Sequence, residues 1–299
     1  QADVQALSTR FDGRAAMKPA LLDDAATYLE GRLTTLGLQV QSQRFSADGR
    51  AYRNLVVQLG PDTPQVVVVG AHYDVFGPNP GADDNASGVA GLIELARMLR
   101  QQPLSRRVEL VAYANEEPPY FRTPHMGSAV HAASLRAAGR QVPLMLSLEC
   151  IGYFSDAPGS QQLPARLMAA AYPTTGNFIA LVGFYRDGPV ARTVKAAMMG
   201  ASDLPVHSIN APGFVVGIDF SDHLNYAQEG FTVAAGDDFA CSGFYGAAGA
   251  AFFSAIACWG SRVNGQIGAP PQPGGFDISM RFPSTASDGG QAPVFGLFK

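Results

Sequence analysis

The stretch VVVVGAHYDVFGPNPGADDNASG, residues 66–88, decides the fold of this chain. Its first part, residues 66–70, is a short apolar run of the kind that forms a buried strand. Residues 89–99 follow with apolar side chains at the spacing of an amphipathic helix. A strand, a loop and a helix in this order predict an α/β domain, in which binding sites form on the loops at the carboxyl ends of strands.

The loop of this stretch carries one imidazole and several carboxylates within a dozen residues, namely His72, Asp74, Asp83 and Asp84. Imidazole and carboxylate side chains are common ligands of divalent metal ions. The loop is therefore predicted to form part of a metal site.

Two more strand-like segments end in acidic side chains. Residues 107–114 lead to Glu116 and Glu117, and residues 144–148 lead to Glu149. A single glutamate at a strand end is usually a solvated loop residue. Three strand ends with acidic or imidazole side chains in one chain favour a shared metal centre, because such ends gather at one edge of an α/β sheet.

These motifs resemble those of a known enzyme family. H-Y-D at 72–74, G-A-D-D-N-A-S-G at 81–88, N-E-E at 115–117 and S-L-E-C-I-G-Y-F at 147–154 have the order and spacing found in the co-catalytic zinc aminopeptidases, of the bacterial leucyl aminopeptidase and aminopeptidase Y type. The resemblance covers about residues 22–230. It implies an α/β fold with a mostly parallel, twisted central sheet flanked by helices on both faces.

The resemblance also implies a role for each candidate residue. Asp83 matches the carboxylate that bridges two zinc ions, and His72 and Glu149 match the other ligands of one ion. Glu117 matches a ligand of the second ion, and Glu116 matches the general base. These roles suit the side chains, because a carboxylate can bridge two metals and one of two adjacent glutamates can accept a proton while the other binds metal.

Further residues are expected around these ligands. Asp74 matches the carboxylate that orients the ring of His72, as ligating histidines usually require. Asp84 follows the bridging position, and the resemblance implies a cis peptide bond between Asp83 and Asp84. The remaining candidates are expected to line the site or its substrate pocket without binding metal: Tyr153, Asp222 and His223.

The chain departs from the family pattern near its C-terminus. The family's second ion has a histidine ligand in an aromatic-His-Thr segment, and the sequence contains no such segment. With only Asp83 and Glu117, the second ion is expected to bind weakly, because zinc usually takes three or more protein ligands. Rescue of this second site by His223 is the alternative.

These observations predict a zinc-dependent aminopeptidase that acts on a peptide or a small amide with a free α-amine. Two alternatives remain: a related metallo-amidase or carboxypeptidase, and a weak or inactive binding ectodomain on the same scaffold. The retained Glu116 argues against the ectodomain, and the missing histidine argues for it. A glutaminyl cyclase is disfavoured, because its single zinc ion uses the missing histidine.

The composition changes near residue 235. Residues 1–235 are predicted to form one α/β domain. Residues 236–299 are rich in Gly, Ala and Pro and poor in charge, so we expect a divergent segment that is partly disordered. A shifted reading frame and a genuine divergent tail would both produce this change.

The composition also limits the partners. A net charge of −4 gives no signal for nucleic acid or an acidic membrane, and no apolar run reaches the length of about 18 residues that suggests a membrane span. The chain begins at Gln1 without a signal peptide, so we expect a fragment or a processed product. The resemblance favours an exported protein. The sequence does not predict the oligomeric state. His131 is expected on the surface or at a helix cap.

Overall fold

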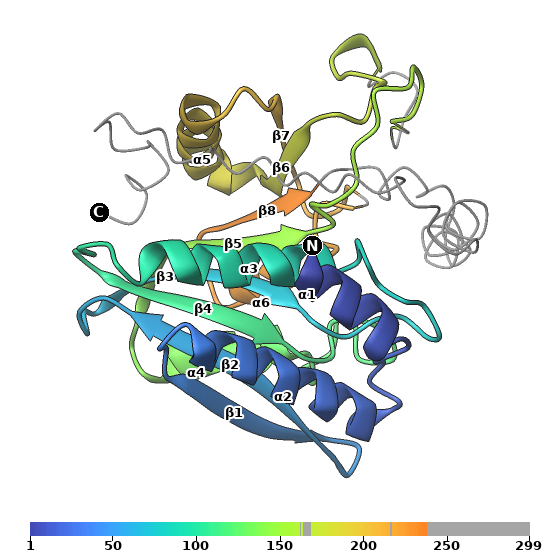
Figure 1. Ribbon diagram of the computed structural model, residues 1–299. Helices are drawn as coiled ribbons and strands as arrows, with labels where there is room; N and C mark the ends of the chain where they lie inside the picture. The colour runs from blue at the N-terminus through green and yellow to red at the C-terminus, as the bar shows by residue number, and fades with distance from the viewer. Residues whose placement is uncertain (162, 164–168, 216, 238–299) are drawn as a thin grey trace.

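The computed structural model describes residues 1–161, 163, 169–215 and 217–237 (Figure 1). Its strands are β1 (Val40–Ala47), β2 (Arg50–Leu59), β3 (Gln65–His72), β4 (Arg107–Tyr113), β5 (Gln141–Glu149), β6 (Ile179–Phe184), β7 (Val206–Ala211) and β8 (Val233–Asp237). Its α-helices are α1 (Ala2–Gln5), α2 (Pro19–Thr35), α3 (Ala86–Leu99), α4 (Gly127–Ala137), α5 (Gly188–Ala201) and α6 (His223–Gln228). A π-helical segment spans Ala6–Arg10 and a 3-10 turn spans Tyr185–Asp187. Apart from its first two residues, the predicted segment 236–299 lies outside the described residues.

The described strands form one eight-stranded sheet in the order β1-β2-β4-β3-β5-β8-β6-β7. Strands β4, β3, β5 and β8 run parallel at its centre, and β6 pairs antiparallel with β8 and parallel with β7. Strands β2 and β1 extend the other edge as antiparallel neighbours. The predicted mostly parallel central sheet is confirmed, with antiparallel strands added on either side.

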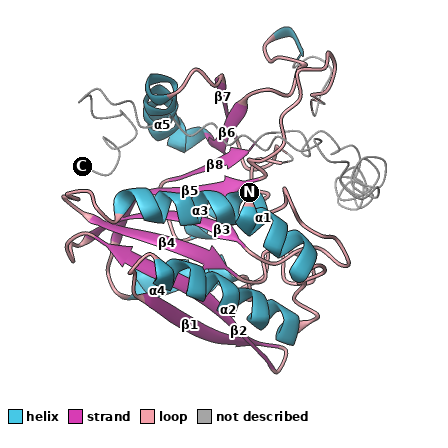
Figure 2. Cartoon of the chain, viewed as in Figure 1, coloured by secondary structure: helices cyan, strands magenta, loops and turns pink. Residues whose placement is uncertain are grey.

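Helices cover both faces of the sheet, as predicted (Figures 1 and 2). Successive side chains of a strand point to opposite faces, and the valines of β3 divide accordingly. Val67 and Val69 pack with α2 and α3, whereas Val66 and Val68 pack with α4 and α6. Because β3 is buried on both faces, its apolar pattern is continuous rather than alternating. In the described part of the chain, no helix has the length and apolar character that crossing a membrane requires.

Three neighbouring parallel strands bring their carboxyl ends to one edge of the sheet. In the sheet register, Gly70 of β3 lies beside Val111 of β4 and Ser147 of β5. His72, the loop after β4 and Glu149 therefore meet at this edge, which is the arrangement predicted from the acidic and imidazole side chains at the three strand ends.

Candidate metal centre

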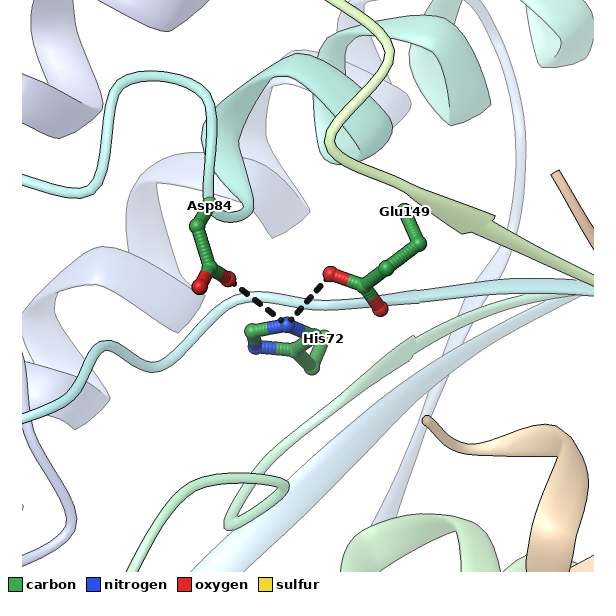
Figure 3. Close-up of side chains that lie close together, drawn as sticks. All are labelled: His72, Asp84 and Glu149. Carbon is green, nitrogen blue, oxygen red and sulfur yellow. Dashed lines mark hydrogen bonds and ion pairs between the residues drawn. The ribbon is translucent and has the colours of Figure 1, made fainter. Parts of the chain in front are cut away.

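Three side chains from three elements meet at this edge (Figure 3). His72 ends β3, Asp84 lies in the loop before α3, and Glu149 ends β5. Nε2 of His72 lies 3.2 Å from Oδ1 of Asp84 and 3.1 Å from Oε1 of Glu149. One ligand atom from each residue lies within 4.8 Å of the others, a spacing that suits a single metal ion. We call His72, Asp84 and Glu149 the metal triad.

The structure corrects the choice between two adjacent aspartates. The sequence predicts Asp83 as the metal ligand, but Asp84 is the residue that lies beside His72. Oδ1 of Asp83 instead accepts a hydrogen bond from the backbone N–H of Gly152, at 2.8 Å. The predicted position of the cis bond is also wrong by one residue, because the cis peptide joins Asp84 to Asn85.

Asn85 ties the Asp84 loop to the end of β5. Its side-chain oxygen accepts hydrogen bonds from the N–H groups of Gly88 (3.1 Å) and Cys150 (3.3 Å), and its amide donates to the carbonyl of Leu148 (2.8 Å). A Cβ at Gly88 would lie 2.4 Å from Oδ1 of Asn85 and 2.6 Å from the carbonyl oxygen of Leu148, so glycine is required there. These two motif residues therefore fix the position of the Asp84 loop relative to β5.

Asp74 is fully buried and holds both the histidine and the glutamate loop. Its backbone oxygen lies 3.2 Å from Nδ1 of His72, and its Oδ1 lies 3.5 Å from the same atom. Its carboxylate also accepts hydrogen bonds from the backbone N–H groups of Glu116 (3.1 Å) and Glu117 (3.0 Å). Nδ1 therefore faces two oxygens of Asp74, whereas Nε2 faces Asp84 and Glu149. A cation bound at Nε2 would leave the ring proton on Nδ1, where Asp74 accepts it.

Glu116 and Glu117 are both buried beside the metal triad. Oε2 of Glu116 lies 3.9 Å from Nε2 of His72. Burial raises the pKa of Glu116 well above its usual range; the charge of His72 opposes this, and the carboxylates of Glu117 and Glu149 add to it. Burial also raises the pKa of Glu117, and Asp84 is the charged neighbour that adds most to that rise.

His72 responds to the same crowding in the opposite direction. Burial by itself lowers the pKa of this imidazole, but the carboxylates of Glu149 and Glu116 outweigh it, so the pKa of His72 is raised well above its usual value. Without a bound cation, the site is therefore a dense group of acids around a single imidazole.

Ser221 is a site residue that the sequence analysis did not single out. Its hydroxyl donates to Oε2 of Glu149 at 2.8 Å and lies 2.9 Å from the hydroxyl of Ser147. This contact occupies one oxygen of Glu149 and leaves the other, Oε1, turned toward His72. Ser221 precedes α6, and nothing in the sequence pattern pairs a serine there with the end of β5.

The residues predicted to line the site divide into two groups. Asp222 is fully buried, and burial raises its pKa to about 7, with opposition from His72. His223 is also buried, but its Nε2 donates to the carbonyl of Ile218 at 2.7 Å, so the ring does not join the metal triad. Tyr153, on the loop after Glu149, is 37% exposed.

The donor set suits a divalent cation with nitrogen and oxygen ligands. Oδ1 of Asp84 is buried and faces Nε2 of His72 at 3.2 Å. A buried carboxylate oxygen is costly unless a cation or a donor meets it, so this oxygen is placed to bind a cation together with Nε2. One imidazole and two carboxylates match the ligand types and number that zinc takes from proteins in catalytic sites. The residues present therefore fit a zinc ion.

Comparison with known proteins identifies the family. The sequence profile of peptidase family M28 matches residues 54–252, of which the last fifteen lie outside the described residues. The chain is also 48% identical over 233 residues to the "Uncharacterized protein YfbL" of Escherichia coli (strain K12), across 75% of this chain and 71% of that protein. The chain belongs to peptidase family M28.

More distant relatives share parts of the sequence or the fold. Leucine aminopeptidase 1 of Trichophyton rubrum is 29% identical over 148 residues, which cover 43% of this chain and 38% of that protein. The crystal structure of the LapA aminopeptidase of Legionella pneumophila superposes with a TM-score of 0.62 at 19% identity, over 79% of this chain and 59% of that chain. Glutaminyl cyclase of Bacteroides thetaiotaomicron, in a structure with N-acetylhistamine, gives a TM-score of 0.57 at 18% identity, over 78% and 81%. The chain spans less than two thirds of both aminopeptidases, and at these identities the solved structures establish the fold alone.

Proposed function

We propose that the protein is a zinc-dependent aminopeptidase that removes N-terminal residues from peptides. The observation that carries this proposal is the metal triad, with the carboxylate of Glu116 3.9 Å from Nε2 of His72. Peptidase family M28 supplies the reaction class, and the leucine aminopeptidase named among the relatives supports the preference for a free N-terminus.

In this proposal the metal triad would hold one zinc ion through Nε2 of His72 and carboxylate oxygens of Asp84 and Glu149. Bound zinc supplies Lewis acidity, which polarises the scissile carbonyl and makes water more acidic. Ser221 and Asp74 keep the ligands in place, because they hold Oε2 of Glu149 and Nδ1 of His72 respectively.

Glu116 would act as the general base. Its carboxylate accepts a proton from the attacking water and delivers that proton to the leaving amine. Asp74 holds the backbone N–H groups of both Glu116 and Glu117, so the two side chains enter the site from adjacent, fixed positions. Burial of Glu116 excludes bulk water from the carboxylate that handles the proton.

Glu117 and Asp84 would form a second, weaker zinc site. Asp84 is the charged neighbour that adds most to the raised pKa of Glu117. His223 donates to Ile218 rather than to this pair. Two carboxylates without an imidazole fall short of the usual zinc ligand set, so we expect unequal occupancy of the two sites.

The test compares Glu116→Gln with Glu117→Gln. Loss of a general base lowers hydrolysis by about 10²–10⁴-fold, so Glu116→Gln should fall by this factor and keep the zinc content of wild type. Glu117→Gln should lose zinc from the weaker site. Glu229→Gln is the control and should match wild type in both measurements, because Glu229 lies at the opposite end of α6 from Asp222.

Two results would count against the proposal. Equal loss of zinc in both glutamate variants would reject this division of roles. A wild type that holds zinc tightly and hydrolyses no peptide would favour the binding ectodomain instead.

A further inference from the structure

Arg14 is a fully buried arginine in the segment before α2. All three of its guanidinium nitrogens donate to backbone carbonyls. Nε donates to Tyr73 at 2.7 Å, Nη1 to Leu7 at 2.8 Å and to Pro80 at 2.9 Å, and Nη2 to Gly81 at 2.9 Å. Three of these four carbonyls belong to the loop between β3 and α3, which carries Asp74 and Asp84.

The backbone around Arg14 is bonded to the same loop. The N–H of Val75 donates to the carbonyl of Arg14, and the N–H of Gly13 donates to the carbonyl of Asn79, both at 3.3 Å. At Gly81 the packing is tight, because a Cβ would lie 2.1 Å from Cγ1 of Val75. The loop thus packs closely around the guanidinium group and is hydrogen-bonded to it.

The guanidinium of Arg14 is hydrogen-bonded to neutral carbonyl groups rather than to a carboxylate. Among the described residues, no carboxylate forms an ion pair with it, and its hydrogen bonds all go to carbonyls. Burial lowers the pKa of Arg14 to about 10, and Asp74 and Asp84 are the two neighbours that favour its charged form most. The positive charge of Arg14 therefore interacts with Asp84, a member of the metal triad, and with Asp74, which contacts His72.

The segment that carries Arg14 is itself anchored in the core. Val4 and Leu7 are buried in the same apolar cluster as α3. Through Arg14, the N-terminal segment is joined to both ends of the loop, at Tyr73 beside His72 and at Gly81 three residues before Asp84.

We propose that Arg14 is a positioning residue of the metal site, which holds the loop so that Asp84 meets His72 and Asp74 reaches the glutamate loop. This inference rests on the proposed function, because it assumes that the metal triad binds zinc. It assigns a role in the site to Arg14, which lies outside the 54–252 match to the family.

A positioning role of Arg14 and a purely electrostatic role predict different zinc affinities for Arg14 variants. A nearby positive charge repels a cation, so if charge alone mattered, Arg14→Met would tighten zinc binding and Arg14→Lys would leave it unchanged. If Arg14 positions the loop, both variants weaken zinc binding, because lysine keeps the charge but cannot reproduce the planar fork that reaches four carbonyls. A purely structural role would lower stability and leave the zinc affinity of the folded protein unchanged.

The experiment measures zinc affinity of the full chain by competition with a chromophoric chelator, below the unfolding temperature of each metal-free variant. We expect both Arg14 variants to bind zinc at least tenfold more weakly than wild type, which is the usual effect of losing a group that orients metal ligands. Arg53→Lys is the matched control. Arg53 is also a buried arginine, but its side chain contacts Asp23 and Glu30 on α2, so this variant should lose stability and keep its zinc affinity.

Hydrogen exchange of residues 73–85 in the metal-free protein gives a second readout that needs no zinc. Exchange should be faster in Arg14→Lys and unchanged in Arg53→Lys. Wild-type zinc affinity in the folded Arg14→Lys protein, or tighter binding in Arg14→Met, would overturn the inference and leave the proposed function standing. A wild type without zinc affinity would overturn both.

Discussion

Replacing Asp74 with asparagine removes the carboxylate behind His72 while changing almost no volume. In the native site, one oxygen of Asp74 accepts the N–H of Glu116 at 3.1 Å and the other accepts the N–H of Glu117 at 3.0 Å. Asparagine has only one side-chain oxygen, so its NH₂ group must face one of these two N–H donors. At least one buried N–H therefore loses its acceptor, and the histidine loses the negative charge near Nδ1.

The expected magnitude follows from these contacts. A hydrogen bond to a charged group contributes about 1.5–3 kcal/mol, and leaving a buried partner unsatisfied costs about 1–3 kcal/mol. We therefore expect Asp74→Asn to lower the free energy of unfolding of the metal-free protein by about 2–4 kcal/mol. Zinc affinity should also fall by about 10–100-fold, as it does when a partner that orients a ligating histidine is lost.

Urea unfolding and chelator competition measure these two quantities on the same samples. Asp24→Asn is the matched control, because Asp24 is exposed on α2, and both of its values should equal those of wild type. An unfolding free energy within about 0.5 kcal/mol of wild type, the usual range for a neutral surface change, would refute the reasoning if it came with unchanged zinc affinity.

Two further predictions concern a histidine and a buried acid. His223→Ala should keep the zinc stoichiometry and affinity of wild type in a calorimetric titration, because Nε2 of His223 donates to Ile218; loss of one site would identify it as a ligand. For Glu109, burial raises the pKa, but His131 and Arg107 outweigh it, and the net pKa lies below the ordinary 4.5. A lowered pKa stabilises the fold above the unfolded value and loses this effect as the pH falls through the folded value. Urea unfolding should show a stability gap between wild type and Glu109→Gln that is full at pH 7 and shrinks below about pH 4; a constant gap would contradict this.

The parts of the fold that the sequence predicts best are those buried on both faces. The apolar run 66–70 lies within β3, and the apolar run 144–148 lies within β5. Such runs are visible in a sequence because both faces of a central parallel strand need apolar side chains. The convergence of His72, Glu116 and Glu149 follows from the same rule, since the carboxyl ends of parallel strands share one edge.

The choice between Asp83 and Asp84 was not predictable in this way. Both are aspartates in one turn, and only the backbone path from Asp84 through Asn85 into α3 decides which carboxylate meets His72. The family resemblance identifies the motif, but a one-residue error within it moves the ligand to a side chain that is bonded to Gly152 instead.

The prediction for His131 was wrong for a similar reason. This residue was expected on the surface or at a cap, but it is buried, with Nδ1 2.5 Å from the hydroxyl of Tyr226 and Nε2 3.2 Å from Oε2 of Glu109. Its place depends on how α4 packs against β4 and α6. Arg14 and Ser221 were not predicted, because most of their partners lie far away in the sequence and such contacts follow no sequence pattern.

The central claim is that the metal triad makes this chain a zinc-dependent aminopeptidase. The most direct test removes metal with a chelator, then measures hydrolysis of leucine 4-nitroanilide as zinc is added back, in wild type and in His72→Ala. We predict that metal-free wild type is inactive, regains activity with zinc, and that His72→Ala neither retains zinc nor recovers. Full hydrolysis by metal-free wild type, or recovery of His72→Ala at the same zinc concentration as wild type, would contradict this account.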